Sequence, residues 1–258
     1  MSTVKVEREG RVAWVILDRP DAANALSKAL VRDLRAALAQ LRHDPPVLIL
    51  TGAGEKAFCA GADLKERRAM TLDETRAFLA ELNATVDELA TFPQMTIAAL
   101  NGVAFGGGLE LALACDLRVA AIGVEVGLPE VRLGIIPGAG GTQRLARLCG
   151  VAVAKELILT GRRLRVDSRR AQEMGLVNGL AERAALREEA LSWAREAATA
   201  GPLAVVQAKR AIDEGFGQPL QDGLAIERAH YEVVLKSDDR NEGLAAFGEK
   251  RKPNFSGK

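Results

Sequence analysis

The fold of this chain depends on the stretch NGVAFGGGLELALACDLRVAA, residues 101–121. A buried-type strand, Thr96–Leu100, precedes it, and three successive glycines then lead into an apolar helix over Leu111–Ala114. The first N–H groups of a helix have no acceptor within the helix, and glycine allows a ligand to approach them closely. The helix dipole adds positive potential at the same end. The stretch therefore predicts a strand-to-helix junction that can hold a negatively charged oxygen.

Glu110 is the first candidate functional side chain. It stands three residues after Gly107, about one helical turn further on, and so lies on the same side of the helix. Its neighbours Leu109, Leu111 and Leu113 are apolar, so we interpret it as a buried functional group rather than an exposed helix charge. An anion-stabilising N–H and a carboxylate would then face one space.

Glu130 is the second candidate. It follows a short apolar strand, Val124–Val126, and a proline that restricts the backbone before it. Locally, it could equally be a plain turn residue. The nearby glycine-rich loop Gly138–Gly141 lacks the lysine spacing of a phosphate-binding loop. We interpret that loop as a structural turn before the helix that contains Gln143.

A third candidate segment consists of small residues followed by charged ones. Small side chains let a ligand touch the backbone, and an aspartate at this position can cap the helix that follows. Taken alone, the segment could also be a plain strand-to-helix turn. Its candidate ligand-contacting residues are Ala60, Gly61, Ala62, Asp63, Leu64 and Lys65.

The first two-thirds of the chain alternate between strand and helix patterns, which predicts an α/β fold. Two strands flank a turn at Glu9-Gly10, and leucines at helical spacing follow Ser27 on one helix face that ends at Pro45-Pro46. A capping-box pattern at residues 71–74 opens a further helix that runs to about residue 89. The remaining predicted strands of this part are Val4–Glu7, Val12–Leu17 and Val47–Thr51.

Beyond about residue 150 the strand patterns become rare, and the chain reads as successive helices with a break at Gly201-Pro202. We therefore expect residues 1–198 to form the α/β core with the ligand site, and residues 199–258 to form a helical region.

Composition excludes several classes of function. The net charge is +1, from 35 basic and 34 acidic residues, so no global field favours nucleic acid or an anionic membrane. The three cysteines form no CxxC pair, and two histidines are too few for a histidine-rich metal site. We predict no metal. The N-terminus shows no export or import pattern and no stretch is long enough to span a membrane, so we expect a cytoplasmic protein.

Two further motifs are set aside. Gly52–Ala57 fits a loose dinucleotide-binding pattern, but such a loop must run directly into a helix, and the residues that follow are poor helix formers. Cys59 has no histidine placed to activate it, so a small apolar filler is the better interpretation. Neither histidine, His43 or His230, lies near a serine nucleophile motif.

Three strings, in this order and spacing, resemble the enoyl-CoA hydratase (crotonase) superfamily. They are FCAGADLKER, IAALNGVAFGGGLELALACDLRVAA and GLPEVRLGIIPGAGGTQRL, and the resemblance continues to the C-terminal GLAAFGEKRKPNF. It implies a spiral of ββα units followed by a C-terminal helical region that builds trimers, commonly paired into hexamers. It also implies an acyl-CoA substrate, in which coenzyme A is part of the substrate, and no separate cofactor.

The resemblance assigns roles to individual residues. Ala62 and Gly107 match the two backbone N–H donors of an oxyanion hole, and Glu110 and Glu130 match the two catalytic glutamates, twenty residues apart. The backbone of residues 60–64 matches the segment beside coenzyme A, and Lys65, Gly106 and Tyr231 join it as expected substrate contacts. Family members that lack one glutamate are often isomerases or hydrolases, so the pair favours a hydratase.

The finer resemblance is to 3-methylglutaconyl-CoA hydratases, the AU-binding subgroup, and implies a role in leucine or isovalerate metabolism. It is carried by residues 24–28, by FCAGADLKER, and by GLAIERAHYE with DRNEGLAAF. The expected substrate has a distal carboxylate, for which the candidate partners are Lys65, Arg67, Arg68 and Tyr231. A general short-chain enoyl-CoA hydratase of fatty-acid oxidation is the alternative.

An RNA-binding protein with residual catalysis is an alternative of another class. Members of the subgroup bind RNA through lysines of the first helix. Here that helix offers the basic residues Lys28, Arg32, Arg35 and Arg42, whereas Ala36 interrupts the series. With a net charge near zero as well, we expect no RNA partner.

Overall fold

The computed structural model describes residues 2–44, 46–165 and 170–258. Its strands are β1 (Val4–Glu9), β2 (Val12–Leu17), β3 (Val47–Gly52), β4 (Ala57–Cys59), β5 (Met95–Leu100), β6 (Val103–Phe105), β7 (Leu117–Ala121), β8 (Glu125–Gly127), β9 (Leu164–Arg165) and β10 (Gly179–Ala181). The α-helices are α1 (Lys28–Leu41), α2 (Leu64–Ala69), α3 (Leu72–Ala90), α4 (Gly107–Ala114), α5 (Gly141–Cys149), α6 (Val151–Leu159), α7 (Arg170–Glu173), α8 (Leu186–Ala198), α9 (Pro202–Gly215), α10 (Leu220–Leu235) and α11 (Asp238–Glu249). Short 3₁₀ helices are η1 (Pro20–Ala22), η2 (Glu130–Leu133) and η3 (Arg183–Ala185).

From β3 to β8, consecutive strands alternate between two sheets. The large sheet has the order β1-β2-β3-β5-β7-β10, and the small sheet has the order β4-β6-β8-β9. Thus β3, β5 and β7 each enter the large sheet, and the strand after each of them enters the small one. A helical segment follows each pair, which produces the expected spiral of ββα units. The α/β class and the crotonase-type architecture are confirmed.

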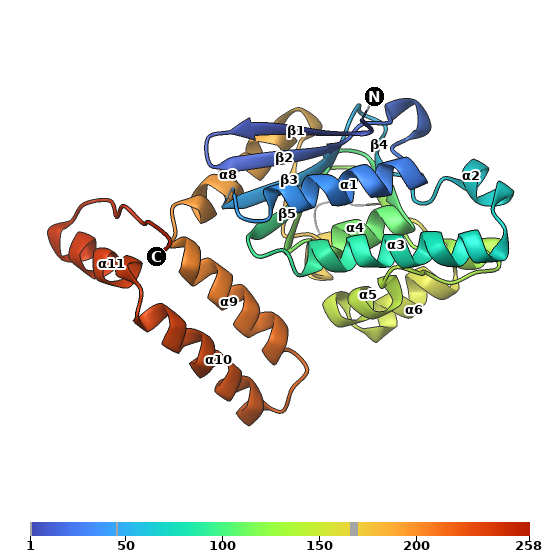
Figure 1. Ribbon diagram of the computed structural model, residues 1–258. Helices are drawn as coiled ribbons and strands as arrows, with labels where there is room; N and C mark the ends of the chain where they lie inside the picture. Colours follow the sequence, from blue (N-terminus) through green and yellow to red (C-terminus); the bar gives the residue numbers. More distant parts are fainter. Residues whose placement is uncertain (1, 45, 166–169) are drawn as a thin grey trace.

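The core lies between the large sheet and the helices on its two sides (Figure 1). Strands β2, β3 and β5 are almost wholly buried, as their continuous apolar sequences require. The leucines that predicted the first helix, Leu30, Leu34, Leu38 and Leu41, are all buried, and the Ser27 side chain accepts the Leu30 N–H bond. Helix α1 ends at Leu41, ahead of the proline pair, of which Pro45 lies outside the described residues.

Helix α3 begins at the predicted capping box. The Thr71 hydroxyl accepts the Glu74 N–H, and the Glu74 carboxylate accepts the Thr71 N–H. This reciprocal pair fixes the start of a 19-residue helix that crosses the molecule beside α4 (Figure 1).

The purely helical interpretation of the chain beyond residue 150 is wrong. Strand β10 pairs in parallel with β7 at the edge of the large sheet, and β9 pairs with β8 in the small one. Both strands are too short to show a strand periodicity. They form because they pair with strands of the two sheets, which is a tertiary contact. Helix α8 packs on the large sheet, and its buried face includes Leu186, Leu191 and Ala194.

Helices α9 and α10 form an antiparallel pair that projects from the sheet layers, with α11 beyond them (Figure 1). Gly201-Pro202 separates α8 from α9 as predicted, since proline stands in the first turn of α9. The boundary at residue 198 coincides with the end of α8, and the division into two functional regions remains a prediction. In the described part of the chain, no helix is long and apolar enough to cross a bilayer.

Candidate active site

The candidate site is built around the N-terminus of α4. The helix begins at Gly107, four residues earlier than predicted, because the glycines themselves take part in it. Gly106 has φ 52° and ψ −127°, a backbone conformation that disfavours a side chain, and its N–H donates to Gly127 O at 2.9 Å. As the first residue of the helix, Gly107 has no acceptor for its N–H among the described residues.

A second backbone segment, Gly61-Ala62, lies close to the start of α4. Leu26 donates to Gly61 O at 2.8 Å and accepts from Asp63 N at 3.0 Å, a parallel bridge that leaves the Ala62 N–H outside the ladder. Gly61 has φ 96°, and a Cβ atom at that position would lie 3.6 Å from Gly107 N. Ala62 N and Gly107 N, which have no acceptor among the described residues, thus lie on neighbouring segments, and their role as an oxyanion hole remains a prediction.

The Glu110 side chain is only 2 % exposed and is held by the loop before α5. Its Oε1 accepts hydrogen bonds from Ala139 N at 2.7 Å and from Gly141 N at 2.8 Å. Burial raises the pKa of Glu110, whereas the two N–H bonds and the nearby Arg144 charge act in the opposite direction. The loop Gly138–Gly141 is the turn before α5, as predicted, and in addition its N–H groups hold Glu110.

Sequence reasoning missed the role of this loop because no local pattern shows what its N–H groups face. A signal was present, since two glycines at a helix start can expose N–H groups toward an anion. The anion is here a carboxylate of another helix. A Cβ atom at position 141 would lie 3.0 Å from Glu110 Oε1, so glycine also permits this close approach.

Glu130 has a different environment from Glu110. It opens η2 directly after Pro129, and its Oε1 lies 3.0 Å from where a Cβ atom of residue 106 would stand. Its Oε2 is buried and has no hydrogen-bond partner among the described residues. Burial, with a further contribution from the Glu110 charge, raises the pKa of Glu130 to about 7. One carboxyl is thus held by donors while the other retains its proton to near neutrality.

The other predicted residues beside the site take structural positions on α2 and before it. Asp63 caps α2 by accepting from Lys65 N and Glu66 N, and pairs with Arg19 at 3.1 Å. Burial opposes ionisation of Asp63, but the Arg19 and backbone bonds prevail and lower its pKa. Ala60 N donates to Ala23 O. Leu64 and Lys65 are exposed.

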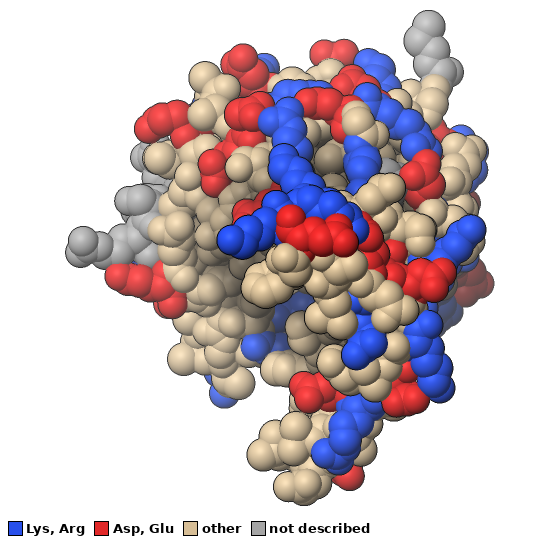
Figure 2. All heavy atoms as spheres, turned by 90° about the vertical axis from the view of Figure 1, so that its left-hand side faces the viewer, with Lys and Arg blue, Asp and Glu red and all other residues tan. Residues whose placement is uncertain are grey.

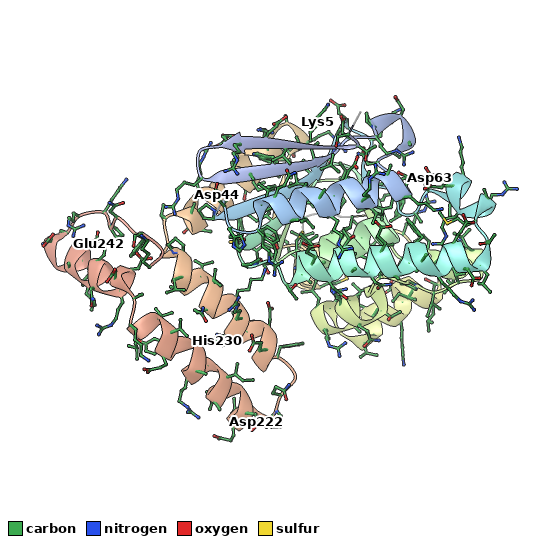
Figure 3. All side chains as sticks on the ribbon, viewed as in Figure 1. Lys5, Asp44, Asp63, Asp222, His230 and Glu242 are labelled. Carbon is green, nitrogen blue, oxygen red and sulfur yellow. The ribbon has the colours of Figure 1, made fainter. Side chains whose placement is uncertain are left out.

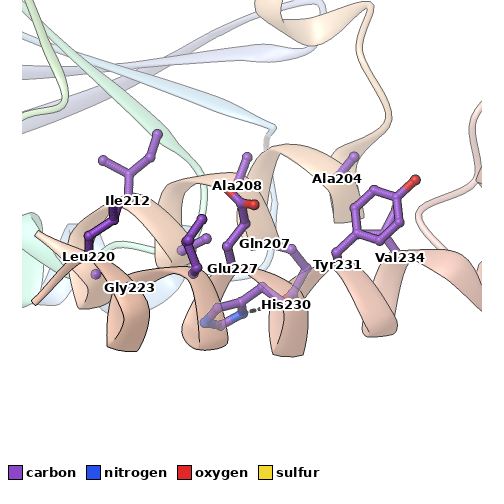
Figure 4. A pocket seen from close by; sticks show the side chains of 13 residues that line it. Ala204, Gln207, Ala208, Ile212, Leu220, Gly223, Glu227, His230, Tyr231 and Val234 are labelled. Atoms are coloured by element: carbon purple, nitrogen blue, oxygen red, sulfur yellow. Dashed lines mark hydrogen bonds between the residues drawn. The ribbon is translucent and has the colours of Figure 1, made fainter. Parts of the chain in front are cut away.

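Tyr231 is not brought to the glutamates within one chain. It lies on α10, 62 % exposed, and lines an apolar groove of about 640 Å³ between α9 and α10 (Figure 4). Figure 3 shows the adjacent His230 on this helix pair, well separated from Asp63 beside α2. His230 contacts Gln207 at 2.7 Å and Glu214 at 3.1 Å, both on α9, and so serves the helix pair.

The loose dinucleotide-binding pattern and Cys59 have structural roles. Residues 52–57 run from β3 into β4 without a helix. Cys59 is fully buried, and burial raises the pKa of its thiol to about 12, which removes the thiolate needed of a nucleophile. Among the described residues no group of three or more potential metal ligands is found.

Similarity to known proteins identifies the family of the chain. Residues 7–258 match the family model described as enoyl-CoA hydratase/isomerase. The chain belongs to that family. The expectation of an enoyl-CoA hydratase-type enzyme is therefore confirmed at family level.

Three similar proteins illustrate this membership. A crystal structure of an enoyl-CoA hydratase from Bacillus anthracis has a TM-score of 0.96 at 47 % identity, over 99 % of this chain and all of that one. The putative enoyl-CoA hydratase/isomerase YngF of Bacillus subtilis is 48 % identical over 99 % of this chain and 97 % of its own length. The human mitochondrial methylglutaconyl-CoA hydratase is 45 % identical, with 98 % and 76 % covered.

Proposed function

We propose that this enzyme adds water across the Cα=Cβ bond of an enoyl-CoA thioester, or removes it in the reverse direction. One observation carries the proposal. The carboxyls of Glu110 and Glu130 lie in different environments, close to two backbone N–H groups that have no acceptor among the described residues. The thioester oxygen would accept hydrogen bonds from Ala62 N and Gly107 N, and the contacts strengthen as the enolate forms. Loss of one such donor typically lowers the rate about a hundred- to a thousandfold.

The two glutamates divide the proton transfers. The loop bonds engage Glu110 Oε1, so its other oxygen is available to orient a water molecule and take its proton as the hydroxyl adds to Cβ. Glu130, with its raised pKa, gives its proton to Cα. After the reaction Glu110 holds the proton from water and Glu130 is ionised, so the proton count balances. No separate cofactor is required.

Substitution of the glutamates tests these roles. In Glu130→Gln we expect hydration to be nearly abolished while acyl-CoA still binds, because the amide keeps the shape but supplies no acidic proton. Glu110→Gln should also lose hydration, because an amide cannot accept the water proton. Stopped assays for turnover and calorimetry for binding measure both effects. Retained turnover in either variant would refute the assigned role.

We propose 3-methylglutaconyl-CoA as the acyl-CoA, with 3-hydroxy-3-methylglutaryl-CoA as the hydrated product. The sequence resemblance to that subgroup supports it, as does the 45 % identity to the human methylglutaconyl-CoA hydratase. The distal carboxylate would meet the basic residues of α2, Lys65, Arg67 and Arg68. The comparable identity to YngF keeps a general short-chain enoyl-CoA hydratase as the second candidate.

A side-by-side assay separates the two substrates. We expect kcat/KM to be higher for 3-methylglutaconyl-CoA than for crotonyl-CoA, since only the former offers a carboxylate to α2. Arg67→Met and Arg68→Met should lower the first value and leave the second unchanged. A strong preference for crotonyl-CoA would reject the proposed substrate.

The coenzyme A moiety would run along residues 60–65 and past Gly106, and Tyr231 would reach it only from another copy of the chain. We propose a homotrimer or a hexamer, in accord with the family resemblance. The described cysteines are all free and at least partly buried, which suits a reducing compartment, and we propose the cytoplasm.

RNA is not proposed as a partner. Three of the basic side chains on α1 already face carboxylates: Lys28 faces Glu74, Arg32 faces Asp33, and Arg35 faces Glu88. On the face drawn in Figure 2, basic and acidic side chains lie next to one another. A gel shift with AU-rich RNA at low salt should therefore show no complex, and a salt-sensitive shift would reopen this alternative.

A further inference from the structure

Glu110 is positioned by a loop, and that loop is in turn held by α3. The Asn83 side chain, on α3, donates to Gly138 O at 2.8 Å. Four residues further along the same helix, Asp87 accepts a bond from Arg144 at 2.8 Å. Arg144 also donates to Ala139 O at 3.0 Å. Two consecutive carbonyls of the loop are therefore bound by side chains that belong to α3 or are anchored on it.

The N–H groups of the same loop point toward the site, whereas its carbonyls accept bonds from the side chains just described. Both backbone groups of Ala139 are hydrogen-bonded, since its carbonyl accepts from Arg144 and its N–H donates to Glu110 at 2.7 Å. Gly141 N supplies the second bond to the carboxylate. A continuous chain of hydrogen bonds thus connects α3 to Glu110 Oε1. A rigid chain of this kind restricts the carboxylate to one orientation.

The geometry points to Asn83, Arg144 and Asp87 as positioning residues for Glu110. We propose that this set, the α3 clamp, fixes the direction in which the free oxygen of Glu110 faces water. The inference rests on the proposed function, in which Glu110 takes the water proton. None of the three residues needs to touch the substrate.

Two further observations show that the clamp and α3 lie against the catalytic segments. Position 140 has φ 96°, and a Cβ atom there would collide with the Arg144 guanidinium, so the backbone is shaped around that side chain. Helix α3 also borders the site directly, because Leu79 and Leu82 lie within 4 Å of where Cβ atoms of Gly138 and Gly107 would stand. One helix therefore contacts both catalytic segments.

The clamp and Glu130 act on different parts of the reaction, which gives a discriminating test. Hydration of crotonyl-CoA needs Glu110 and Glu130, whereas exchange of a Cα proton of butyryl-CoA with D2O needs only Glu130 and the two backbone donors. In the exchange, Glu130 removes the Cα proton and, after equilibration with solvent, returns a deuteron to Cα.

We expect Asn83→Ala and Arg144→Met each to lower kcat for crotonyl-CoA hydration about tenfold, with KM changed less than twofold. Deuterium exchange into butyryl-CoA should stay within twofold of wild type. Arg144→Lys should recover only part of the loss, because one ammonium cannot span the two acceptors as the guanidinium fork does. Arg147→Met is the matched control, since Arg147 is exposed and bonds only Gln143 on its own helix.

The pH profile adds a readout that a purely structural role would not change. The loop N–H bonds and the Arg144 charge both lower the pKa of Glu110 against the effect of burial. Weakening them should move the acidic limb of kcat/KM to higher pH. Asn83→Ala removes no charge, so a shift in that variant reports the bonds alone.

The possible outcomes distinguish failure of the proposed function from failure of the clamp. If Glu110→Gln retains hydration, the proposed function fails and the clamp fails with it. If Glu110→Gln is inactive but Asn83→Ala and Arg144→Met hydrate like wild type, only the clamp is refuted. A parallel fall of hydration and exchange, with a lowered melting temperature, would also refute the clamp and assign these residues to stability.

Discussion

At the residue scale, two glutamates of the same chemistry acquire different properties from their surroundings. Glu110 is more deeply buried, yet two N–H donors and a nearby guanidinium favour its charged form. Glu130 is less buried, but one of its oxygens has no partner among the described residues and the neighbouring carboxylate repels its charge. Burial raises the pKa of both carboxyls, and hydrogen bonding distinguishes them, because N–H donors oppose that rise at Glu110.

The pH dependence of Glu130 is the first prediction at this scale. Its pKa of about 7 in the folded chain lies above the ordinary 4.5, so folding takes up a proton between these values. Stability should fall as pH rises from 4.5 toward 7 and then level off, because the ionised form is the one that burial penalises. Hydration should fall as the pH rises through about 7, because Glu130 then loses the proton that it donates.

Glu130→Gln isolates this effect. The variant should melt at a higher temperature than wild type at pH 8, and the difference should shrink at pH 5, where the wild-type side chain is protonated. Thermal melts at both pH values measure it. An equal difference at the two pH values would contradict a raised pKa in the folded chain.

Residue-level reasoning from the sequence succeeded where local context carries the information. The apolar neighbours of Glu110 indicated its burial, and the glycines indicated free N–H groups. It could not find Ala139 or Gly141 as partners of Glu110, because they lie about thirty residues away and only the packing of α5 against α4 brings them close.

At the element scale, α4 connects the candidate site with a buried arginine. Its N-terminus carries the free Gly107 donor, and its C-terminal carbonyls bind Arg118, which is 3 % exposed. Arg118 donates to Cys115 O and to Leu176 O, each at 2.8 Å, and more weakly to Ala112 O. A cation here also complements the negative end of the helix dipole. Burial lowers the Arg118 pKa.

Arg118→Met is the prediction at this scale. It leaves buried carbonyls without donors, so the free energy of unfolding should fall by about 2–3 kcal/mol. Hydration kcat should fall as well, since α4, whose first residue is the Gly107 donor, loses the anchor at its C-terminal end. Denaturant melts and steady-state kinetics test both. Arg8→Met, which breaks only the exposed pair with Asp44, serves as control and should cost less than about 1 kcal/mol.

At the scale of the whole molecule, the C-terminal helices expose large apolar side chains that no other described part of the chain covers. Examples are Phe247 at 86 %, Leu220 at 74 % and Ile212 at 69 % exposed. Exposed apolar surface of this kind marks an interaction site. These residues lie in the region 199–258 that the sequence assigned to oligomerisation.

Phe247→Asp should therefore lower the molar mass measured by light scattering or sedimentation, because it places a charge in a predicted interface between copies. Val6→Asp on the outer strand β1 is the control and should leave the mass unchanged, since Val6 belongs to the large sheet and not to the C-terminal helices. A monomeric wild type would contradict the predicted trimer or hexamer.

The two glutamates and the Gly107 donor are site predictions from the sequence, and Ala62 joins them through the family resemblance. The sequence by itself determined the α/β class and the capped helices α1 and α3. Each of these depends on neighbours within a few residues, so periodicity, caps and glycines reveal it. Only the tertiary structure decided the alternation of strands between two sheets, the edge strand β10, the loop that holds Glu110 and the distance of Tyr231 from the site. These depend on contacts between segments far apart in the chain, and no local pattern encodes such contacts.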